Sequence, residues 1–112
     1  METGKINAEF IAKAIVLKEA VQYAPDSVVS KTIIDKKVGT ISLFAFDAGQ
    51  GLSEHQAPYD AFVQVIDGTG KFTVGKETIR LSSGQIVIMP ANIAHSVTAE
   101  EKFKMMLIMI RA

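Results

Sequence analysis

The chain of 112 residues has no cysteine and no tryptophan, and it contains only two histidines and three prolines. The absence of cysteine excludes disulfide bonds, thiolate-ligated zinc, iron–sulfur clusters and a thiol nucleophile. Any chemistry at a site in this chain is therefore expected to use histidine, carboxylate, amide or hydroxyl groups.

The chain also lacks an excess of charge of either sign, because 12 Lys and Arg residues balance 12 Asp and Glu residues. A balanced surface does not attract phosphate backbones or anionic membranes, so neither nucleic acid nor a membrane is expected as a partner. The longest apolar run near the C-terminus, residues 105–110, is far shorter than the roughly 20 residues of a membrane-spanning helix. The N-terminus mixes both charges and lacks the apolar core of a signal peptide, which predicts a cytoplasmic protein.

Hydrophobic residues make up 48% of the chain, which is enough to bury one core. We therefore expect a single domain over residues 1–112, with an N-terminal extension at 1–26 and a β-barrel at 27–112. Residues 8–22 contain neither glycine nor proline, and this predicts a short helical segment around residues 17–23.

After residue 26 the sequence consists of short β-forming runs separated by turns that contain glycine. About eight strands at this even spacing predict an all-β fold, either a closed barrel or a jelly roll. The predicted strands are residues 28–34, 40–46, 61–66, 71–74, 78–81, 85–89, 95–98 and 103–110.

Two of these strands, residues 85–89 and 105–110, are apolar on both faces. One face can fill the barrel, and the other then needs a second layer. We favour a homodimer that packs sheet against sheet, with the alternative that the N-terminal segment covers this face within one chain.

Two short motifs surround the two histidines. The first contains a glycine, a histidine six residues later and a closing glycine, and the second contains a glycine, a proline and a histidine. The six residues at these positions are Gly49, His55, Gly68, Gly84, Pro90 and His95. With this spacing the chain resembles the cupin family, in the small RmlC-like, conserved-barrel type. The resemblance implies a double-stranded β-helix, or jelly-roll barrel, with the histidines in its pocket.

In metal-binding cupins the ligands are typically three histidines and one glutamate, and the resemblance places them at positions 55, 57, 61 and 95. Positions 57 and 61 are alanine here, so only His55 and His95 remain as ligands for a divalent transition metal such as Ni, Zn, Mn, Fe or Cu. Gln64 is either a third ligand or a hydrogen-bonded core group. It is three residues after Ala61 on the same strand, so strand alternation turns its side chain away from the lumen.

Strand alternation predicts an apolar pocket that carries two imidazoles. Ala57, Ala61 and Val63 share the inward face with His55, and His95 joins them from the facing strand. The methionines at 89, 105, 106 and 109 are expected to fill the core and not to bind copper. Catalytic residues are not identified by the sequence.

Two hypotheses for the function follow. The first is a binding module that holds a small organic molecule near His55 and His95, with a degenerate metal site. The second is a metal-dependent enzyme of the oxygenase or isomerase type that uses the two histidines as ligands. The alanines at positions 57 and 61 favour binding, and the sequence leaves open whether the protein is an enzyme.

Overall fold

The computed structural model describes residues 5–111, and nine β-strands make up most of this range. Two short 3-10 turns precede the second strand. In chain order the elements are β1 (Lys5–Ile6), η1 (Ala8–Phe10), η2 (Leu17–Glu19), β2 (Val28–Lys36), β3 (Gly39–Phe46), β4 (Gly51–His55), β5 (Asp60–Val74), β6 (Glu77–Ser82), β7 (Ile86–Met89), β8 (His95–Thr98) and β9 (Phe103–Ile110).

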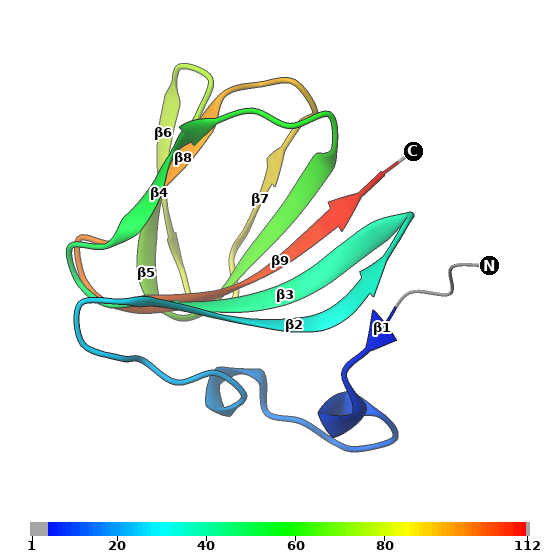
Figure 1. Ribbon diagram of the computed structural model, residues 1–112. Helices are drawn as coiled ribbons and strands as arrows, with labels where there is room; N and C mark the ends of the chain where they lie inside the picture. The colour runs from blue at the N-terminus through cyan, green and yellow to red at the C-terminus, as the bar shows by residue number, and fades with distance from the viewer. Residues whose placement is uncertain (1–4, 112) are drawn as a thin grey trace.

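The strands form two antiparallel sheets that fold over one another as a barrel (Figure 1). One sheet has the order β1-β2-β3-β9-β5-β7, and the other has the order β4-β8-β5-β6. The long strand β5 belongs to both sheets. Its first half pairs with β7 and β9, and its second half pairs with β6 and β8. The predicted all-β barrel is confirmed.

Strand β5 differs from the prediction, which divided it into two strands with a turn at residues 67–70. The backbone instead continues through this stretch, with a register shift between Val65 and Asp67 in its pairing with β9. Gly68 has a φ of +72°, a conformation that glycine adopts without strain. The glycine bends the strand from one sheet into the other and does not end it. Strand β4 was also missed, because its exposed, polar sequence lacks a strand pattern.

The helical segment predicted for residues 17–23 is only the turn η2, Leu17–Glu19. This N-terminal stretch is held by packing on the outer face of the β2-β3-β9 sheet. Val21 forms a buried cluster there with Leu43 and Ala45. The Tyr23 hydroxyl donates a 2.7 Å hydrogen bond to Asp67, and the Lys104 ammonium lies 4.7 Å from the Tyr23 ring centroid.

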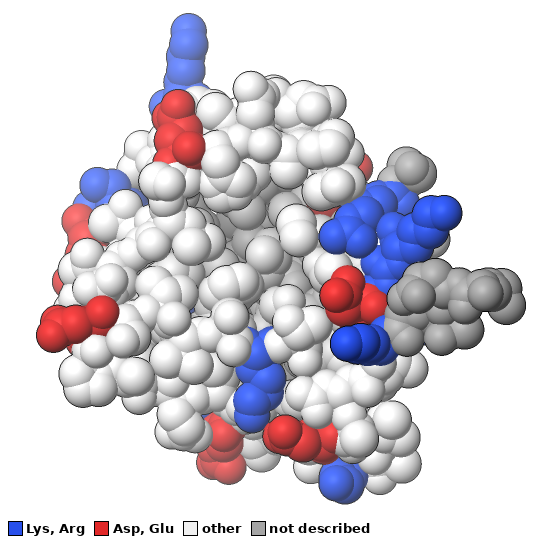
Figure 2. Space-filling model, viewed as in Figure 1, with Lys and Arg blue, Asp and Glu red and all other residues white. Residues whose placement is uncertain are grey.

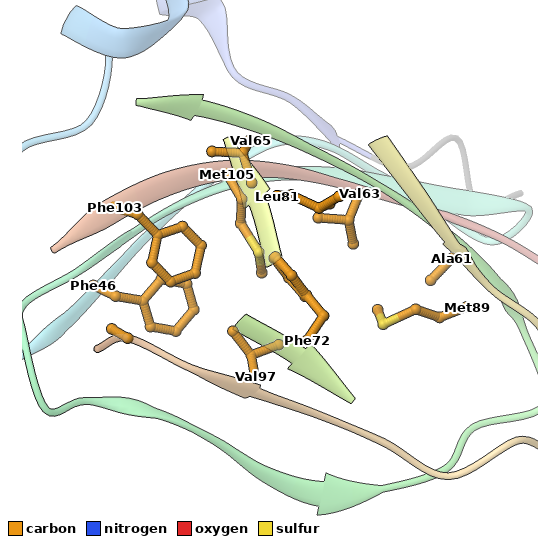
Figure 3. Packing of buried hydrophobic residues seen from close by; sticks show 11 residues of the cluster. Phe46, Ala61, Val63, Val65, Phe72, Leu81, Met89, Val97, Phe103 and Met105 are labelled. Atoms are coloured by element: carbon orange, nitrogen blue, oxygen red, sulfur yellow. The ribbon is translucent and has the colours of Figure 1, made fainter. Parts of the chain in front are cut away.

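The main core fills the barrel between the two sheets, with aromatic rings at one end (Figure 3). Phe46 and Phe103 stack with ring centroids 4.7 Å apart, and Phe72 meets Phe103 edge-on at 5.8 Å. Ala61 and Met89 lie at the other end of the same cluster. The aromatic end is closely packed, so an open cavity is confined to the end with small and flexible side chains. Between residues 5 and 111, no helix is long and apolar enough to cross a membrane.

Candidate functional site

The two histidines meet because their strands are neighbours. His55 ends β4, His95 begins β8, and the two residues are directly opposite each other in the ladder. The loop before His95 is held by a side chain, since the Asp60 carboxylate accepts a 2.9 Å hydrogen bond from the backbone N–H of Ala91. Asn92 has a φ of +64°, and its backbone N–H donates a 2.8 Å hydrogen bond to the carbonyl oxygen of Ala57. Asparagine tolerates this left-handed conformation better than most residues, so it can hold the turn that aims His95.

The imidazole rings contact each other through their Nε2 atoms, which are 3.1 Å apart. Each Nδ1 atom faces a backbone carbonyl oxygen: His55 Nδ1 lies 2.8 Å from Ser53 O, and His95 Nδ1 lies 3.1 Å from Ile93 O. A carbonyl oxygen only accepts, so each Nδ1 carries a proton. The rings are inclined at 72° with their centroids 4.3 Å apart, and their Nε2 atoms are in direct contact.

A count of protons shows what this arrangement lacks. Three contacts need a proton or another cation, namely two Nδ1–carbonyl contacts and the Nε2–Nε2 contact. Two neutral imidazoles supply only two N–H protons, and both are used by the carbonyls. The two Nε2 lone pairs therefore face each other, and a third proton or a metal cation between them would satisfy both.

His95 is the buried member of the pair, with 6% of its surface exposed, whereas His55 is exposed. Burial lowers the pKa of His95, the hydrogen bond to Ile93 O raises it, and the nearby His55 lowers it further. The net direction is downward, so the neutral form of His95 is favoured in the folded protein.

A cavity opens beside the histidine pair, inside the barrel. The volume of this cavity is about 50 Å³, so the cavity is narrow. Eleven residues line it: Leu52, His55, Ala57, Tyr59, Ala61, Met89, His95, Val97, Met105, Leu107 and Met109. Its wall is mostly apolar, with polar atoms concentrated at the imidazoles. The face of the molecule in Figure 2 is hollowed near its centre, and uncharged residues surround the hollow.

The structure brings together four of the five residues predicted for the pocket. His55, Ala57, Ala61 and His95 line the cavity, whereas Val63 is fully buried in the core and does not line it. Val63 lies two residues further along β5, where the two sheets close over the lumen. Gln64 faces away from the cavity, as strand alternation predicts, and borders an outer groove beside η2.

Seven of the eleven lining residues are not among the five predicted for the pocket. Met105, Leu107 and Met109 share one face of β9 because they alternate along it, and period-two alternation was the signal in the sequence. Both faces of that strand are apolar, so the pattern alone does not tell which face lines a cavity. Tyr59 lies in the loop before β5, where no periodicity applies.

The side chains around the histidines do not form the metal site of the family. Over residues 5–111, no group of three or more His, Cys, Asp or Glu side chains comes together as a metal site. The described lining includes no carboxylate, so a divalent ion in the cavity would have two neutral nitrogen ligands and no anionic one. Burying a double charge without an anionic partner is unfavourable. The three-histidine, one-glutamate site therefore does not fit this chain.

Comparisons with a family model and with solved structures agree on one family. The sequence model of the family described as "Cupin domain" matches residues 42–111. A conserved protein of unknown function from Streptococcus pyogenes is 34% identical, covers 96% of this chain and 94% of its own, and superimposes with a TM-score of 0.90. A cupin 2 conserved barrel domain protein from Leptotrichia buccalis is 40% identical, covers 85% of this chain and 46% of its own, and has a TM-score of 0.82.

One curated relative also matches, an uncharacterized protein from Streptomyces coelicolor that is 36% identical over 56 residues. That match covers 50% of this chain, and the chain spans about half (53%) of the length of that relative. The family match covers more than half of the chain and includes both histidines and the strands that hold them. The chain belongs to the cupin family.

Proposed function

We propose that this cupin is a binding module that holds a small organic molecule in the cavity beside His55 and His95. The observation that carries the proposal is the division of the cavity into an apolar wall and a polar end. Alanine and methionine side chains form much of the wall, and two imidazoles stand at one side of it. Ligand pockets in proteins commonly combine a largely apolar surface with a few polar groups that orient the ligand.

The size and chemistry of the cavity define the class of ligand. A cavity volume of about 50 Å³ suits a molecule with few heavy atoms or a slender, planar shape. The apolar body of such a ligand would lie against Ala61 and Leu107, and one polar group would hydrogen-bond to an imidazole nitrogen. Three methionines line the cavity, and their flexible side chains can enlarge it to admit a ligand.

Catalysis is the second hypothesis, and the convergent imidazoles are the observation in its favour. A histidine pair can accept and return a proton on a bound substrate. The buried His95, whose pKa is lowered, would be the base and the exposed His55 its partner. We rank binding first, because the metal shell that would position a substrate for oxygenase or isomerase chemistry does not fit this donor set.

The test is a ligand screen on metal-free protein by two-dimensional NMR, with methyl-labelled methionine as the reporter. The probes are single-ring and short-chain compounds with one polar group, such as phenol, benzoate and butyrate. We expect saturable shifts of the Met89, Met105 and Met109 methyl groups and little change at Met106, which packs on the outer face.

Two alanine variants form a matched pair for this screen. Ala61→Leu fills the cavity and is expected to weaken binding about tenfold or more, about 1.4 kcal/mol. Ala48→Leu makes the same change at an exposed loop position between β3 and β4 and should bind like the wild type. The proposal is refuted if no probe shifts the three methyl groups, or if Ala61→Leu binds as well as Ala48→Leu.

A further inference from the structure

A groove beside the β2–β3 turn collects positive charge from segments that are far apart in the sequence. The segments meet there because β1 pairs with β2 and the backbone N–H of Arg111 donates a 2.8 Å hydrogen bond to the carbonyl oxygen of Val38. Figure 2 shows Lys and Arg side chains gathered on the side of the molecule where this turn lies in Figure 1. Five residues line the groove: Lys5, Asp35, Lys36, Lys37 and Arg111. Four cations and one carboxylate give an excess of three positive charges, in a chain whose net charge is zero.

The two arginines of the chain differ in how their charge is compensated. Arg80 donates two 2.9 Å hydrogen bonds to the carboxylate of Glu100. Arg111 instead has neutral partners, since its Nη1 donates to the Lys36 carbonyl at 2.9 Å and its guanidinium carbon lies 5.0 Å from the Tyr59 ring centroid. Within residues 5–111, no carboxylate pairs with Arg111, and its buried Nε atom has no hydrogen-bond partner. A guanidinium has five N–H donors, so Arg111 is a fixed cation with donors left for an anion.

The lysines of the groove also lack an ion pair in the part of the chain that the structure describes. The ion pairs found there lie elsewhere, at Lys31 and at Arg80. Asp35 stands opposite Lys5 in the β1–β2 ladder, but the two side chains are not within ion-pair distance. The excess positive charge of the groove therefore has no counterion among the described residues.

We propose that this groove binds the phosphate group of a small molecule, with Arg111 as the central contact and the three lysines around it. A phosphate monoester carries a charge of about −1.5 to −2 near neutral pH and has three acceptor oxygens, so it balances more of the excess than a carboxylate does. The planar guanidinium can donate to two phosphate oxygens at once. The groove has a volume of about 360 Å³, which leaves room for the organic part of the ligand.

The distribution of charge favours a small ligand over a nucleic acid. A nucleic acid follows an extended basic surface through many phosphate contacts. Here the positive excess lies in one groove, and the chain as a whole is neutral. The groove shares no lining residue with the histidine cavity, so the phosphate site is independent of the binding function proposed above.

The experiment follows the side-chain Nε–H signals of the two arginines by NMR, in a titration at constant ionic strength near neutral pH. The probes are inorganic phosphate and phenyl phosphate, with benzoate as an aromatic anion of single charge. We expect both phosphates to shift the Arg111 signal in a saturable way and to leave the signal of the ion-paired Arg80 nearly unchanged. Benzoate should bind at Arg111 about tenfold more weakly than phenyl phosphate, because it carries less charge.

Two lysines in equivalent turns form a matched pair of variants. Lys37→Gln removes a cation from the groove in the turn between β2 and β3, and Lys76→Gln removes one from the turn between β5 and β6. Both lysines are exposed, so both variants should keep the fold. We expect Lys37→Gln to weaken phosphate binding about two- to fivefold, as for an exposed charge pair, and Lys76→Gln to bind like the wild type.

Arg111→Gln tests the central contact, with the backbone N–H signals of Lys37 and Val38 as reporters. It should weaken phosphate binding by about tenfold or more, because a charge-assisted hydrogen bond is lost. Circular dichroism checks that this variant folds, and Lys37→Gln keeps the test decisive if it does not.

Four results would overturn the inference: no saturable shift of the Arg111 signal with either phosphate, equal shifts at Arg80 and Arg111, equal affinity of Lys37→Gln and Lys76→Gln, or equal binding of benzoate and phenyl phosphate at Arg111. The methionine methyl signals of the ligand screen report on the histidine cavity. Failure of the phosphate site and failure of the proposed binding function are therefore seen separately.

Discussion

His95 links the stability of the protein to pH because the folded chain holds it in a mostly apolar site. Its pKa lies below the ordinary 6.5, first because of burial. As the pH falls through 6.5, the unfolded chain takes up a proton at this residue and the folded chain does not. The free energy of unfolding therefore decreases with acidification until the pH reaches the lowered pKa.

We predict that metal-free wild-type protein is less stable at pH 5.5 than at pH 7.5, and that His95→Gln reduces this difference. Urea unfolding at the two pH values measures it. His55→Gln should keep most of the difference, since His55 is the smallest of the causes acting on the pKa of His95. Equal pH dependence in wild type and His95→Gln would show that another group is responsible.

Two small residues, like the two histidines, contribute to what the pocket can bind. Ala57 and Ala61 line the cavity and place methyl groups where the family has ligands. Their size leaves space beside the imidazoles, and the methionines around Ala61 border that space. Alanine at these two positions is thus where this chain departs from the three-histidine, one-glutamate pattern that the resemblance implies.

Among the elements, β5 determines the shape of the barrel because it passes from one sheet into the other. Gly70 lies in this passage, directly against the Phe103 ring. A Cβ atom at position 70 would lie 2.5 Å from Phe103 Cε2, far inside van der Waals contact. The ring is fully buried and stacked on Phe46, so it has little room to move.

Gly70→Ala is predicted to destabilise the protein by about 1–3 kcal/mol, the usual cost of overpacking a core. Chemical denaturation measures the change. Phe103→Leu in the same chain removes the ring, so the double variant should lose less stability than the sum of the two single variants. Strict additivity in this cycle would mean that the glycine is needed for backbone freedom and not for the ring.

The whole molecule has an outer sheet face that one chain covers only in part. The N-terminal segment buries Leu43 and Ala45, as the single-chain alternative requires. Further along the sheet Ile86, Ile88 and Ile110 remain 48%, 50% and 58% exposed. Such an uncovered apolar region is typical of an interface between subunits.

The homodimer expected from the strands that are apolar on both faces therefore remains our prediction. The exposed region around Ile86, Ile88 and Ile110 would form the contact between the two subunits. Light scattering should give the mass of two chains for the wild type. Ile88→Lys is expected to give a monomer, while Val38→Lys, at another exposed aliphatic position in the β2–β3 turn, should stay dimeric. A wild-type protein with the mass of one chain would exclude the dimer.

Much of the fold was determined by local patterns that the sequence carries by itself. Runs of β-forming residues between glycines predict the strands, because alternation and positive φ are properties of neighbouring residues. The spacing around Gly49, His55 and His95 was enough to indicate the barrel and to place both histidines in its pocket. The two alanines at ligand positions were also visible without a structure.

Other features were decided only by the tertiary structure. The passage of β5 through Gly68, the burial of Val63 below the cavity and the choice of which β9 face lines it depend on pairing between distant strands. The same holds for the 3.1 Å approach of the two Nε2 atoms and for the two methionines that flank Ala61. Residues far apart in the chain acquire these distances only when the register of two sheets and their curvature are set together, and no local pattern specifies that combination.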